Sequence, residues 1–511
     1  MAYANVCILL NGRHMTTIAV IYAICAFLLA VYGINTHMLV QLFTRHFPER
    51  MKTDKAFLAD FYSQNSPFEK TNEAAANLPT VTTQLPIFNE LNVVERLIDA
   101  VAAFQYPEGL HEIQVLDDST DETRMIVAEK VRILQEQGID IHHITRHDRT
   151  GFKAGALREG LARARGEFVA IFDADFNPPS DFLLRAMPFF VDQPRLGLVQ
   201  ARWGHINKEE NWVTRLQAIG INGHFMVEQG ARSANRLFMN FNGTAGVFRK
   251  TAILDAGNWQ EDTLTEDMDL SYRLQLRGWQ CRYLIDLVAP AEIPRDLNAF
   301  KNQQFRWAKG SIQTAIKLMP RIWQSSFRPF VKFQAFMHMS HYIIHPLMLI
   351  LAILAPVLLL QKTRFLTGIG FFGFGGLLLL SCTGPSRMYL VAEHALGRRY
   401  LHTLRHLPFM VCFGCGLAVN NSRAVMEALL GKSSPFVRTP KSGEHTRKVY
   451  RISKNPLIYL ELLIGAWCLF GVVLYFYSHH YLIGHFMLIY AVGFLYIGGL
   501  SWWQGHRIPS L

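Results

Sequence analysis

The chain has 511 residues, of which 51 are Lys or Arg and 40 are Asp or Glu, giving a formal net charge of +11. Half of the residues are hydrophobic, only 18% are charged, and the mean hydropathy is slightly positive. These values exclude a disordered chain, a collagen-like fibre and a small disulfide-stapled domain. A positive mean hydropathy is unusual for a soluble enzyme, so we expect membrane-spanning segments as well as a folded soluble region.

Five apolar stretches are predicted to cross a bilayer. The first, residues 17–43, exceeds the roughly 20 residues that a spanning helix needs. A signal peptide is the weaker alternative, because the apolar run is long and no clear small-residue cleavage site follows it. The other four predicted spans are residues 336–360, 366–384, 456–477 and 481–503. Residues 407–430 contain a shorter apolar stretch, which we expect to lie in the interface, with a sixth crossing left open.

Basic residues predict how the chain lies in the membrane. The link 431–455 holds seven Lys or Arg residues and one Glu, and the link 385–406 is also basic. Because loops rich in Lys and Arg stay on the cytoplasmic side, we expect both links and the charged region 44–330 to face the cytoplasm at the inner (plasma) membrane. This topology explains the net positive charge, and no nucleic-acid-binding motif competes with that explanation.

The predicted topology divides the chain into five segments. These are an N-terminal segment with a transmembrane helix, a cytoplasmic domain with interface helices, a transmembrane hairpin with a basic link, an interface helix with a basic loop, and a second transmembrane hairpin with a short tail. Their bounds are 1–44, 45–330, 331–406, 407–455 and 456–511.

Strand and helix patterns alternate between residues 78 and 172. The strand patterns are 78–85, 112–116, 139–144 and 168–172, and helix patterns at 89–103, 121–137 and 153–164 separate them. Alternation of this kind predicts an α/β domain with a doubly wound, mostly parallel sheet. Ligands of such sheets bind at the carboxyl ends of the strands.

Two pairs of aspartates stand at those strand ends. Asp173 and Asp175 follow the strand 168–172, and two carboxylates one residue apart on a turn can share a hard divalent cation. Phosphate oxygens and water would supply its other ligands. Asp117 and Asp118 follow the strand 112–116, where a carboxylate can accept hydrogen bonds from a nucleotide base or ribose. Capping of the following helix is the alternative for this second pair.

Two acidic residues precede a later helix pattern. Glu266 and Asp267 follow Thr265, and Asp267 is a candidate general base that takes a proton from an attacking hydroxyl. The alternative is that both residues only stabilise the helix N-terminus through its dipole.

Basic and aromatic candidates complete the set. Arg306, in the run from Gln303 to Trp307, suits a diphosphate, and Trp307 offers a flat apolar face to a sugar ring. An interfacial Trp/Arg anchor is the alternative. Lys153 follows Gly151 at a helix start and suits a phosphate group, or is a surface lysine at a turn.

In this order and between membrane segments, these motifs resemble the processive family-2 glycosyltransferases, the group of cellulose, mannan, hyaluronan and chitin synthases. The family's D, D-x-D, T-E-D and Q-x-x-R-W elements all have matches, and the resemblance covers roughly residues 78–455. It is closest to the bacterial cellulose synthase-like and plant glucomannan synthase-like branch. The resemblance implies a GT-A domain that inverts the anomeric carbon of a nucleotide sugar with the help of Mg²⁺ or Mn²⁺.

The resemblance also implies roles for individual residues. Asp173 and Asp175 would hold the metal ion, and Asp267 would be the catalytic base. Phe88 stands where the family has a tyrosine that stacks on the base, so stacking is kept and any hydroxyl contact is lost. The residues implied for the nucleotide are Phe88, Glu90, Asp117, Asp118, Lys153 and Asp173. Those implied for the acceptor and diphosphate are Glu266, Gln303, Arg306 and Trp307.

A basic segment near the C-terminal hairpin resembles the gating loop of cellulose-type synthases. Its implied function is that of a lid over bound substrate, and its basic content suits contact with a diphosphate. The residues concerned are Phe436, Arg438, Thr439 and Lys441.

The sequence therefore predicts a membrane-embedded glycosyltransferase that polymerises a β-linked polysaccharide and helps to pass it across the membrane. UDP-glucose is the first donor expected and GDP-mannose the second. The nearest alternative is an enzyme that adds one sugar to a membrane lipid such as ceramide or diacylglycerol. A non-catalytic export channel is a further alternative, which the complete acidic set argues against. The need for an accessory export subunit is left open by the sequence.

Overall fold

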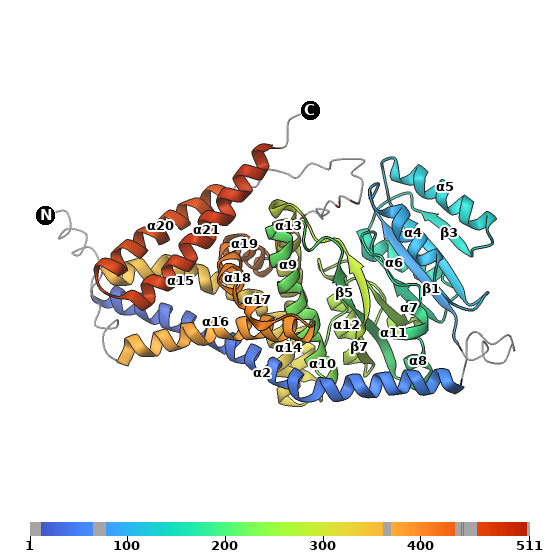
Figure 1. The fold of residues 1–511 in the computed structure, drawn as a ribbon, viewed down its shortest axis with the longest axis horizontal. Coiled ribbons are helices and arrows are strands. Elements are labelled where there is room, and N and C mark those ends of the chain that lie inside the picture. The colour runs from blue at the N-terminus through green and yellow to red at the C-terminus, as the bar shows by residue number, and fades with distance from the viewer. Residues whose placement is uncertain are drawn as a thin grey trace.

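The computed structural model of the chain describes residues 12–64, 78–360, 369–434, 441, 443 and 457–507. An α/β domain lies beside a bundle of long helices, and the N-terminal helix α2 runs along both (Figure 1). The strands are β1 (Val81–Ile87), β2 (His111–Asp117), β3 (Ile141–Thr145), β4 (Phe168–Ile171), β5 (Leu196–His205), β6 (Gly246–Arg249) and β7 (Gln280–Ala291).

The helices of the α/β domain and of its edge are α4 (Val94–Ala102), α5 (Thr123–Glu136), α6 (Phe152–Arg163), α7 (Phe182–Ala186), α8 (Pro188–Asp192), α9 (Trp212–Asn222), the π-helix η1 (Gly223–Glu228), α10 (Gln229–Ala234), α11 (Lys250–Asp255), α12 (Glu266–Leu276) and α13 (Leu297–Gln324). The remaining helices are α2 (Gly12–Gln64), α14 (Pro329–Met339), the 3-10 helix η2 (His341–Ile343), α15 (Ile344–Leu360), α16 (Ile369–Ala395), α17 (Tyr400–Leu404), α18 (Leu407–Gly416), α19 (Ala418–Leu429), α20 (Leu457–Tyr477) and α21 (Tyr481–Arg507).

The seven strands form one sheet in the order β3-β2-β1-β4-β6-β5-β7. All neighbouring strands are parallel except β6, which is antiparallel to both β4 and β5. Apolar side chains of α4, α5, α7 and α8 pack on one face, and those of α6, α11 and α12 on the other. The predicted mostly parallel, doubly wound sheet is therefore confirmed.

Strand β1 continues past Pro86 to Ile87, whereas the sequence pattern predicted that it ends at residue 85. Val81 donates its N–H to Leu110 on the β2 side, so the even-numbered residues of β1 direct their N–H groups toward β4. Pairing with β4 stops at Gln84. Pro86 therefore stands where no N–H is needed, and β1 continues to Ile87 beside β2.

Four helices in the described part of the chain are long and apolar enough to cross a membrane, within Thr17–Ser63, His341–Leu360, Leu457–Tyr477 and Tyr481–Gly505. They correspond to four of the five predicted spans. Helix α2 does not end near residue 44 but continues to Gln64, and its second half packs against the core of the α/β domain through Phe57, Leu58 and Phe61.

The fifth predicted span, 366–384, lies partly outside the described residues. Its described part belongs to α16, which packs tightly along α2, because a Cβ added at Gly33 would lie 2.2 Å from the carbonyl oxygen of Leu380. The apolar stretch within 407–430 forms two short helices, α18 and α19, and neither has the length of a spanning helix. The crossing by 366–384 and the interfacial position of 407–430 stay predictions.

A buried ion pair joins the α/β domain to the membrane helices. Lys301 on α13 donates from Nζ to both carboxylate oxygens of Glu461 on α20, at 2.6 and 2.8 Å, and neither side chain is exposed. The carbonyl oxygen of Lys301 accepts a bond from Asn420 on α19. Burying two charges is unfavourable unless each satisfies the other, so this pair fixes how α13 sits on the bundle.

We predict that replacing only one member of this pair destabilises the protein more than replacing both members with apolar residues. Lys301→Met leaves Glu461 as an unpaired buried charge, and the loss is expected to be about 3–5 kcal/mol, which lowers the melting temperature of the detergent-purified protein. The double variant Lys301→Met/Glu461→Leu is expected to recover most of that loss. A double variant as unstable as the single one would contradict the pairing.

Candidate functional site

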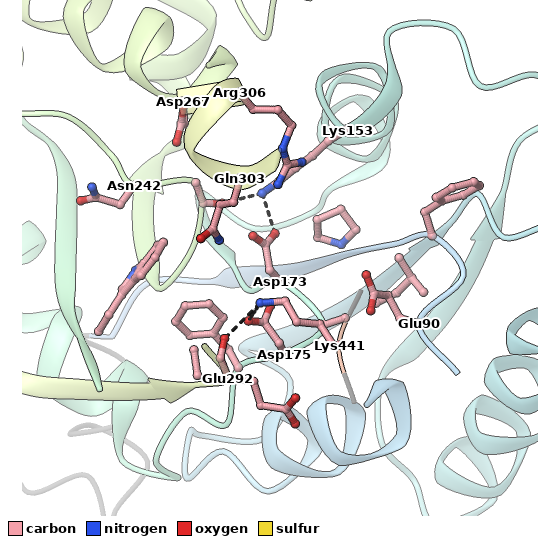
Figure 2. A pocket seen from close by; sticks show the side chains of 18 of the residues that line it. Glu90, Lys153, Asp173, Asp175, Asn242, Asp267, Glu292, Gln303, Arg306 and Lys441 are labelled. Atoms are coloured by element: carbon pink, nitrogen blue, oxygen red, sulfur yellow. Dashed lines mark hydrogen bonds and ion pairs between the residues drawn. The ribbon is translucent and has the colours of Figure 1, made fainter. Parts of the chain in front are cut away.

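The main cavity of the described chain lies at the carboxyl ends of the central strands and has a volume of about 220 Å³. Its walls come from the loops after β1, β2 and β4, from the start of α12, and from α13. Most of the residues that the sequence singled out line it: Phe88, Glu90, Asp118, Lys153, Asp173, Asp175, Glu266, Asp267, Gln303, Arg306, Trp307 and Lys441. Figure 2 shows many of these side chains directed toward one space.

Each of the two aspartates after β4 is paired with a lysine. Asp173 accepts from Nζ of Lys153 at 2.5 Å, and its own N–H donates to the hydroxyl of Thr244 at 2.9 Å. Asp175 accepts from Nζ of Lys441 at 2.6 Å (Figure 2). Burial raises the pKa of Asp173, although the ammonium of Lys153 opposes that rise. Two hard carboxylate oxygens thus stand together, neutralised by cations from α6 and from the segment around residue 441.

Glu266 and Asp267 begin α12 and face the same cavity. Asp267 accepts the N–H of Met268 at 2.8 Å, which leaves its other carboxylate oxygen beside Gly243, where an added Cβ would lie 3.1 Å from it. Burial and the neighbouring Glu266 carboxylate raise the pKa of Asp267 to about 7. A carboxyl group with that pKa can take up and release a proton near neutrality, as a general base must.

Helix α13 supplies the next wall. Asp296 caps it by accepting the N–H groups of Asn298 and Ala299 at 2.7 and 3.0 Å, which fixes where the helix begins. Gln303, Arg306 and Trp307 lie on its cavity side. Burial lowers the pKa of Arg306, but guanidinium groups remain charged at any physiological pH, so it is a permanent cation for an anionic ligand.

The nucleotide end predicted from the sequence is rich in arginine. Arg146 donates from Nε to Asp118 at 2.8 Å and also bonds its second oxygen. The guanidinium of Arg149 lies 3.1 Å from the centroid of the Phe88 ring. Phe88 is therefore available in the cavity as a flat apolar surface, with a cation already stacked on it.

The expectation that Asp117 contacts the nucleoside is corrected by its position. Its carboxylate is fully buried and bonds Nε2 of His143 at 2.9 Å and the N–H of Ser119 at 2.8 Å. It does not line the cavity, whereas Asp118 does. Asp117 instead holds the loop after β2 against β3 through His143. It does not cap the following helix α5, whose N-cap residue is Glu122, so the capping alternative does not apply to it.

The segment that resembles a gating loop lies mostly outside the described residues, and this includes Phe436, Arg438 and Thr439. Lys441 is described and reaches the cavity. Besides Asp175, its Nζ bonds the carbonyl oxygen of Glu292 at 3.0 Å, and its own carbonyl oxygen accepts from Asn92 at 2.9 Å.

Several lining residues were not predicted as site residues from the sequence. They include Arg149, His205, Asn242 and Glu292. Trp203 stacks on Phe225 in the interior and also lines the cavity.

Comparisons with known proteins agree with this geometry. Residues 79–310 match the family model described as glycosyltransferase like family 2. Glucomannan 4-beta-mannosyltransferase 7 of Arabidopsis thaliana is 32% identical over 508 residues, which are 95% of this chain and 87% of that protein. Probable glucomannan 4-beta-mannosyltransferase 3 of Oryza sativa subsp. japonica is 33% identical over 442 residues, covering 82% of this chain and 77% of that protein.

The chain belongs to the family-2 glycosyltransferases. Within the family it is a glucomannan synthase-like, cellulose synthase-like member, as the sequence motifs predicted, and it has the GT-A fold of an inverting glycosyltransferase. Among solved structures, the mannosyltransferase PcManGT from Pyrobaculum calidifontis in complex with GDP-Man and Mn²⁺ is 18% identical, with a TM-score of 0.46, covering 79% of this chain and 100% of that one.

Close packing between α12 and α13 holds the two halves of the glycosyltransferase site together. Gly310 on α13 lies against Thr265, and an added Cβ would stand 2.5 Å from its Cγ2 and 2.8 Å from its backbone nitrogen. Because Thr265 directly precedes Glu266 and Asp267, any displacement here moves the carboxylates relative to Arg306.

We predict that Gly310→Ala lowers the rate of sugar transfer about 100-fold, the loss expected when reacting groups are misplaced by about 1 Å. The rate of nucleoside diphosphate release from the donor measures it. Gly414→Ala on α18 is the matched control, because an added Cβ there meets nothing within 4 Å. Wild-type turnover by Gly310→Ala would show that this packing does not set the geometry of the site.

Proposed function

We propose that this glycosyltransferase polymerises a β-linked mannan or glucomannan from GDP-mannose and passes the chain across the membrane. The observation that carries the proposal is the set of acidic and basic side chains around one cavity, in a chain whose relatives include proteins named glucomannan 4-beta-mannosyltransferase 7 and probable glucomannan 4-beta-mannosyltransferase 3. Those names favour GDP-mannose as the first donor and GDP-glucose as the second, which reverses the order of UDP-glucose and GDP-mannose expected from the sequence.

In the proposed reaction, Asp267 takes the proton of the acceptor hydroxyl as that oxygen attacks the anomeric carbon. The bond from the anomeric carbon to the diphosphate breaks on the opposite side, so one displacement inverts the configuration. Arg306 and Lys153 lie near the carboxylates of the site and would stabilise the negative charge that develops on the leaving diphosphate. The raised pKa of Asp267 makes it a stronger base than an ordinary aspartate.

The carboxylates of Asp173 and Asp175 fit a divalent cation. Both are hard oxygen ligands one residue apart, and in the described chain each faces a lysine ammonium, which marks the place where positive charge is needed. The described residues offer no group of three or more His, Cys, Asp or Glu side chains that would enclose a metal by themselves. Mg²⁺ or Mn²⁺ bound here would share its ligands with the diphosphate and neutralise it.

The acceptor end of the cavity adjoins the membrane helices. Trp307 lines the cavity and also packs, with Phe305, against a cluster that includes Tyr342 of η2 and Val425 of α19. A glycan leaving this end would therefore meet the helix bundle first. This adjacency supports the proposal that synthesis is coupled to translocation, with the α/β domain on the cytoplasmic side of the membrane that houses the enzyme.

The proposal predicts the product. Purified protein incubated with radiolabelled GDP-mannose and Mn²⁺ is expected to form a polymer that an endo-β-1,4-mannanase digests, and the same assay with GDP-glucose and UDP-glucose ranks the donors. A single organic-soluble glycolipid would instead support transfer to a membrane lipid. An absence of product from every donor would support the non-catalytic export channel.

We predict that Asp267→Asn lowers turnover more than 1,000-fold, which is within the range for loss of a general base, while GDP binding stays nearly unchanged. In the wild type, protonation of Asp267 removes the base, so the rate is expected to fall as pH drops below about 7. Asp262→Asn is the control, because that carboxylate is exposed and pairs with Lys317. A pH profile that stays flat from 8 to 5.5 would exclude Asp267 as the base.

We also predict that EDTA stops the reaction and that Mg²⁺ or Mn²⁺ restores it. Asp175→Asn removes one proposed ligand and is expected to raise the Mn²⁺ concentration for half-maximal binding about tenfold or more, as measured by Mn²⁺ electron paramagnetic resonance with GDP present. The exposed Asp181, which pairs with Arg185, provides the control variant Asp181→Asn. Full activity in chelator would contradict the metal assignment.

A further inference from the structure

One lysine close to the helix of the proposed base has no function in the reaction described above. Lys317 lies on α13 about three turns after Arg306 and is not one of the cavity-lining residues of the described chain. Its Nζ lies 2.7 Å from Oε1 of Gln260, 2.7 Å from Oδ1 of Asp262 and 2.9 Å from Oδ1 of Asp269. Lys317 therefore joins α13 to α12 and to the loop that precedes α12.

The two ion pairs of Lys317 differ in how far they are exposed to water. The side chain of Asp262 is 57% exposed, so its pair with Lys317 contributes little to stability. The side chain of Asp269 is fully buried, and that of Lys317 is only 23% exposed. Separating a buried carboxylate from its cation is unfavourable, so the pair with Asp269 restrains the distance between α12 and α13.

Asp269 has a second cation on its own helix. Nε of Arg273 donates to Oδ2 of Asp269 at 2.7 Å, and Nη2 of Arg273 donates to the carbonyl oxygen of Asn258 at 2.9 Å. These bonds fix the carboxylate to α12 and to the turn after α11, whereas Lys317 links it to α13. Because Arg273 still pairs with Asp269 when Lys317 is replaced, we expect such a variant to keep its fold.

Lys317 belongs to a face of α13 that holds the segment around the proposed base. Oε1 of Gln313 accepts the N–H of Leu264 at 3.0 Å, and the hydroxyls of Thr314 and Thr265 share a hydrogen bond at 3.1 Å. Positions 313, 314 and 317 lie on one side of the helix because three or four residues make one turn. The first two hold the backbone that leads into α12, and Lys317 holds α12 itself.

The restraint at Asp269 is close to the proposed base. Asp267 and Asp269 are both in the first turn of α12, and the N–H of Asp269 donates to the carbonyl oxygen of Thr265 at 3.0 Å. A shift of this turn relative to α13 would therefore move Asp267 as well. Figure 2 shows Asp267 and Arg306 of α13 on the same side of the cavity, so such a shift would change the separation of the two groups.

We propose that Lys317 is a positioning residue, whose ion pair with Asp269 holds α12 at the distance from α13 that places Asp267 against the acceptor hydroxyl. It acts through Asp269 and not by contact with substrate. The inference rests on the proposed function, because it takes Asp267 as the base.

The test compares sugar transfer with hydrolysis of the donor. Full-length protein in detergent is assayed with GDP-mannose, first with a β-1,4-linked manno-oligosaccharide as acceptor and then without it, where GDP release reports attack by water. A bound hydroxyl needs the base at one position, whereas a water molecule can move to a displaced base. Lys317→Met is expected to lower kcat for transfer about tenfold and to leave kcat for hydrolysis and KM for GDP-mannose within about twofold.

Two further measurements separate positioning from a loss of structure or of charge. Lys317→Arg keeps a cation beside Asp269 and is expected to recover most of the lost transfer rate. The pH at which the transfer rate of Lys317→Met falls by half is expected to equal that of the wild type, because Glu266 and Lys153, whose charges act on Asp267, stay in place. Lys317→Gln keeps a donor in a shorter side chain, so it keeps the test decisive where Lys317→Met lowers the melting temperature.

The matched control removes the exposed partner of the same ammonium. Asp262→Asn is expected to transfer at the wild-type rate, because its pair with Lys317 is exposed. Lys55→Met on α2 controls for the loss of a surface cation, since its pair with Asp286 is exposed on both sides.

The outcomes distinguish this inference from the proposed function. Wild-type transfer by Lys317→Met, an equal fall in transfer and hydrolysis, a shifted pH midpoint, or the same loss in Asp262→Asn overturns the inference while the proposed function stands. A wild-type protein that neither transfers nor hydrolyses any of the three nucleotide sugars overturns both.

Discussion

The balance of buried charge in one cleft is the constraint on which the site depends. The carboxylates that line it include those of Asp173, Asp175, Glu266 and Asp267, and the cations that line it include those of Lys153, Arg306 and Lys441. Like charges this close would raise one another's pKa until some were neutralised, unless cations were near. Asp267 shows the outcome of the competition, because burial and Glu266 outweigh the cations and leave it with a pKa of about 7.

The cleft exists only when several distant segments have folded together. Asp173 belongs to the end of β4, Asp267 to the start of α12 and Arg306 to α13. Helix α13 has a second function, because its Lys301 forms the buried pair with Glu461 of a membrane helix. Helix α13, which lines the cavity with Gln303, Arg306 and Trp307, is thus anchored in the bundle, so the cavity keeps a fixed position relative to the membrane helices.

Much of the site followed from the sequence because parallel strands bring their carboxyl ends to one edge. This rule was enough to place Asp118, Asp173 and Asp175 together. Asp267 and Arg306 were candidates from their own chemistry, and the resemblance to a known family placed them in the same site. The strand-end rule could not tell which of Asp117 and Asp118 lines the cavity, because neighbouring residues at a strand end point in different directions. The contact with His143 is what keeps Asp117 buried beside β3. Asn242 was missed for a related reason, since a single amide between glycine-rich turns has no periodicity or spacing that marks it.

The membrane-spanning helices were predictable where the length of an apolar stretch alone determines them. Helix ends that depend on packing against other parts of the protein were not predictable. Four predicted spans follow directly from hydropathy. The continuation of α2 to Gln64 does not, because it depends on apolar side chains of its second half finding the core of the α/β domain. The end of β1 is similar, because Pro86 is tolerated only as a result of where β4 stops.

The central claim is that these carboxylates and cations bind one metal-bound nucleotide sugar. An experimental structure of the purified protein with GDP-mannose and Mn²⁺ tests it most directly. The account predicts an anomalous signal of manganese between Asp173 and Asp175, guanine against Phe88, Lys441 released from Asp175, and the mannose ring between Asp267 and Arg306. Manganese bound elsewhere, or a sugar too far from Asp267 for its acceptor to touch that carboxylate, would contradict it.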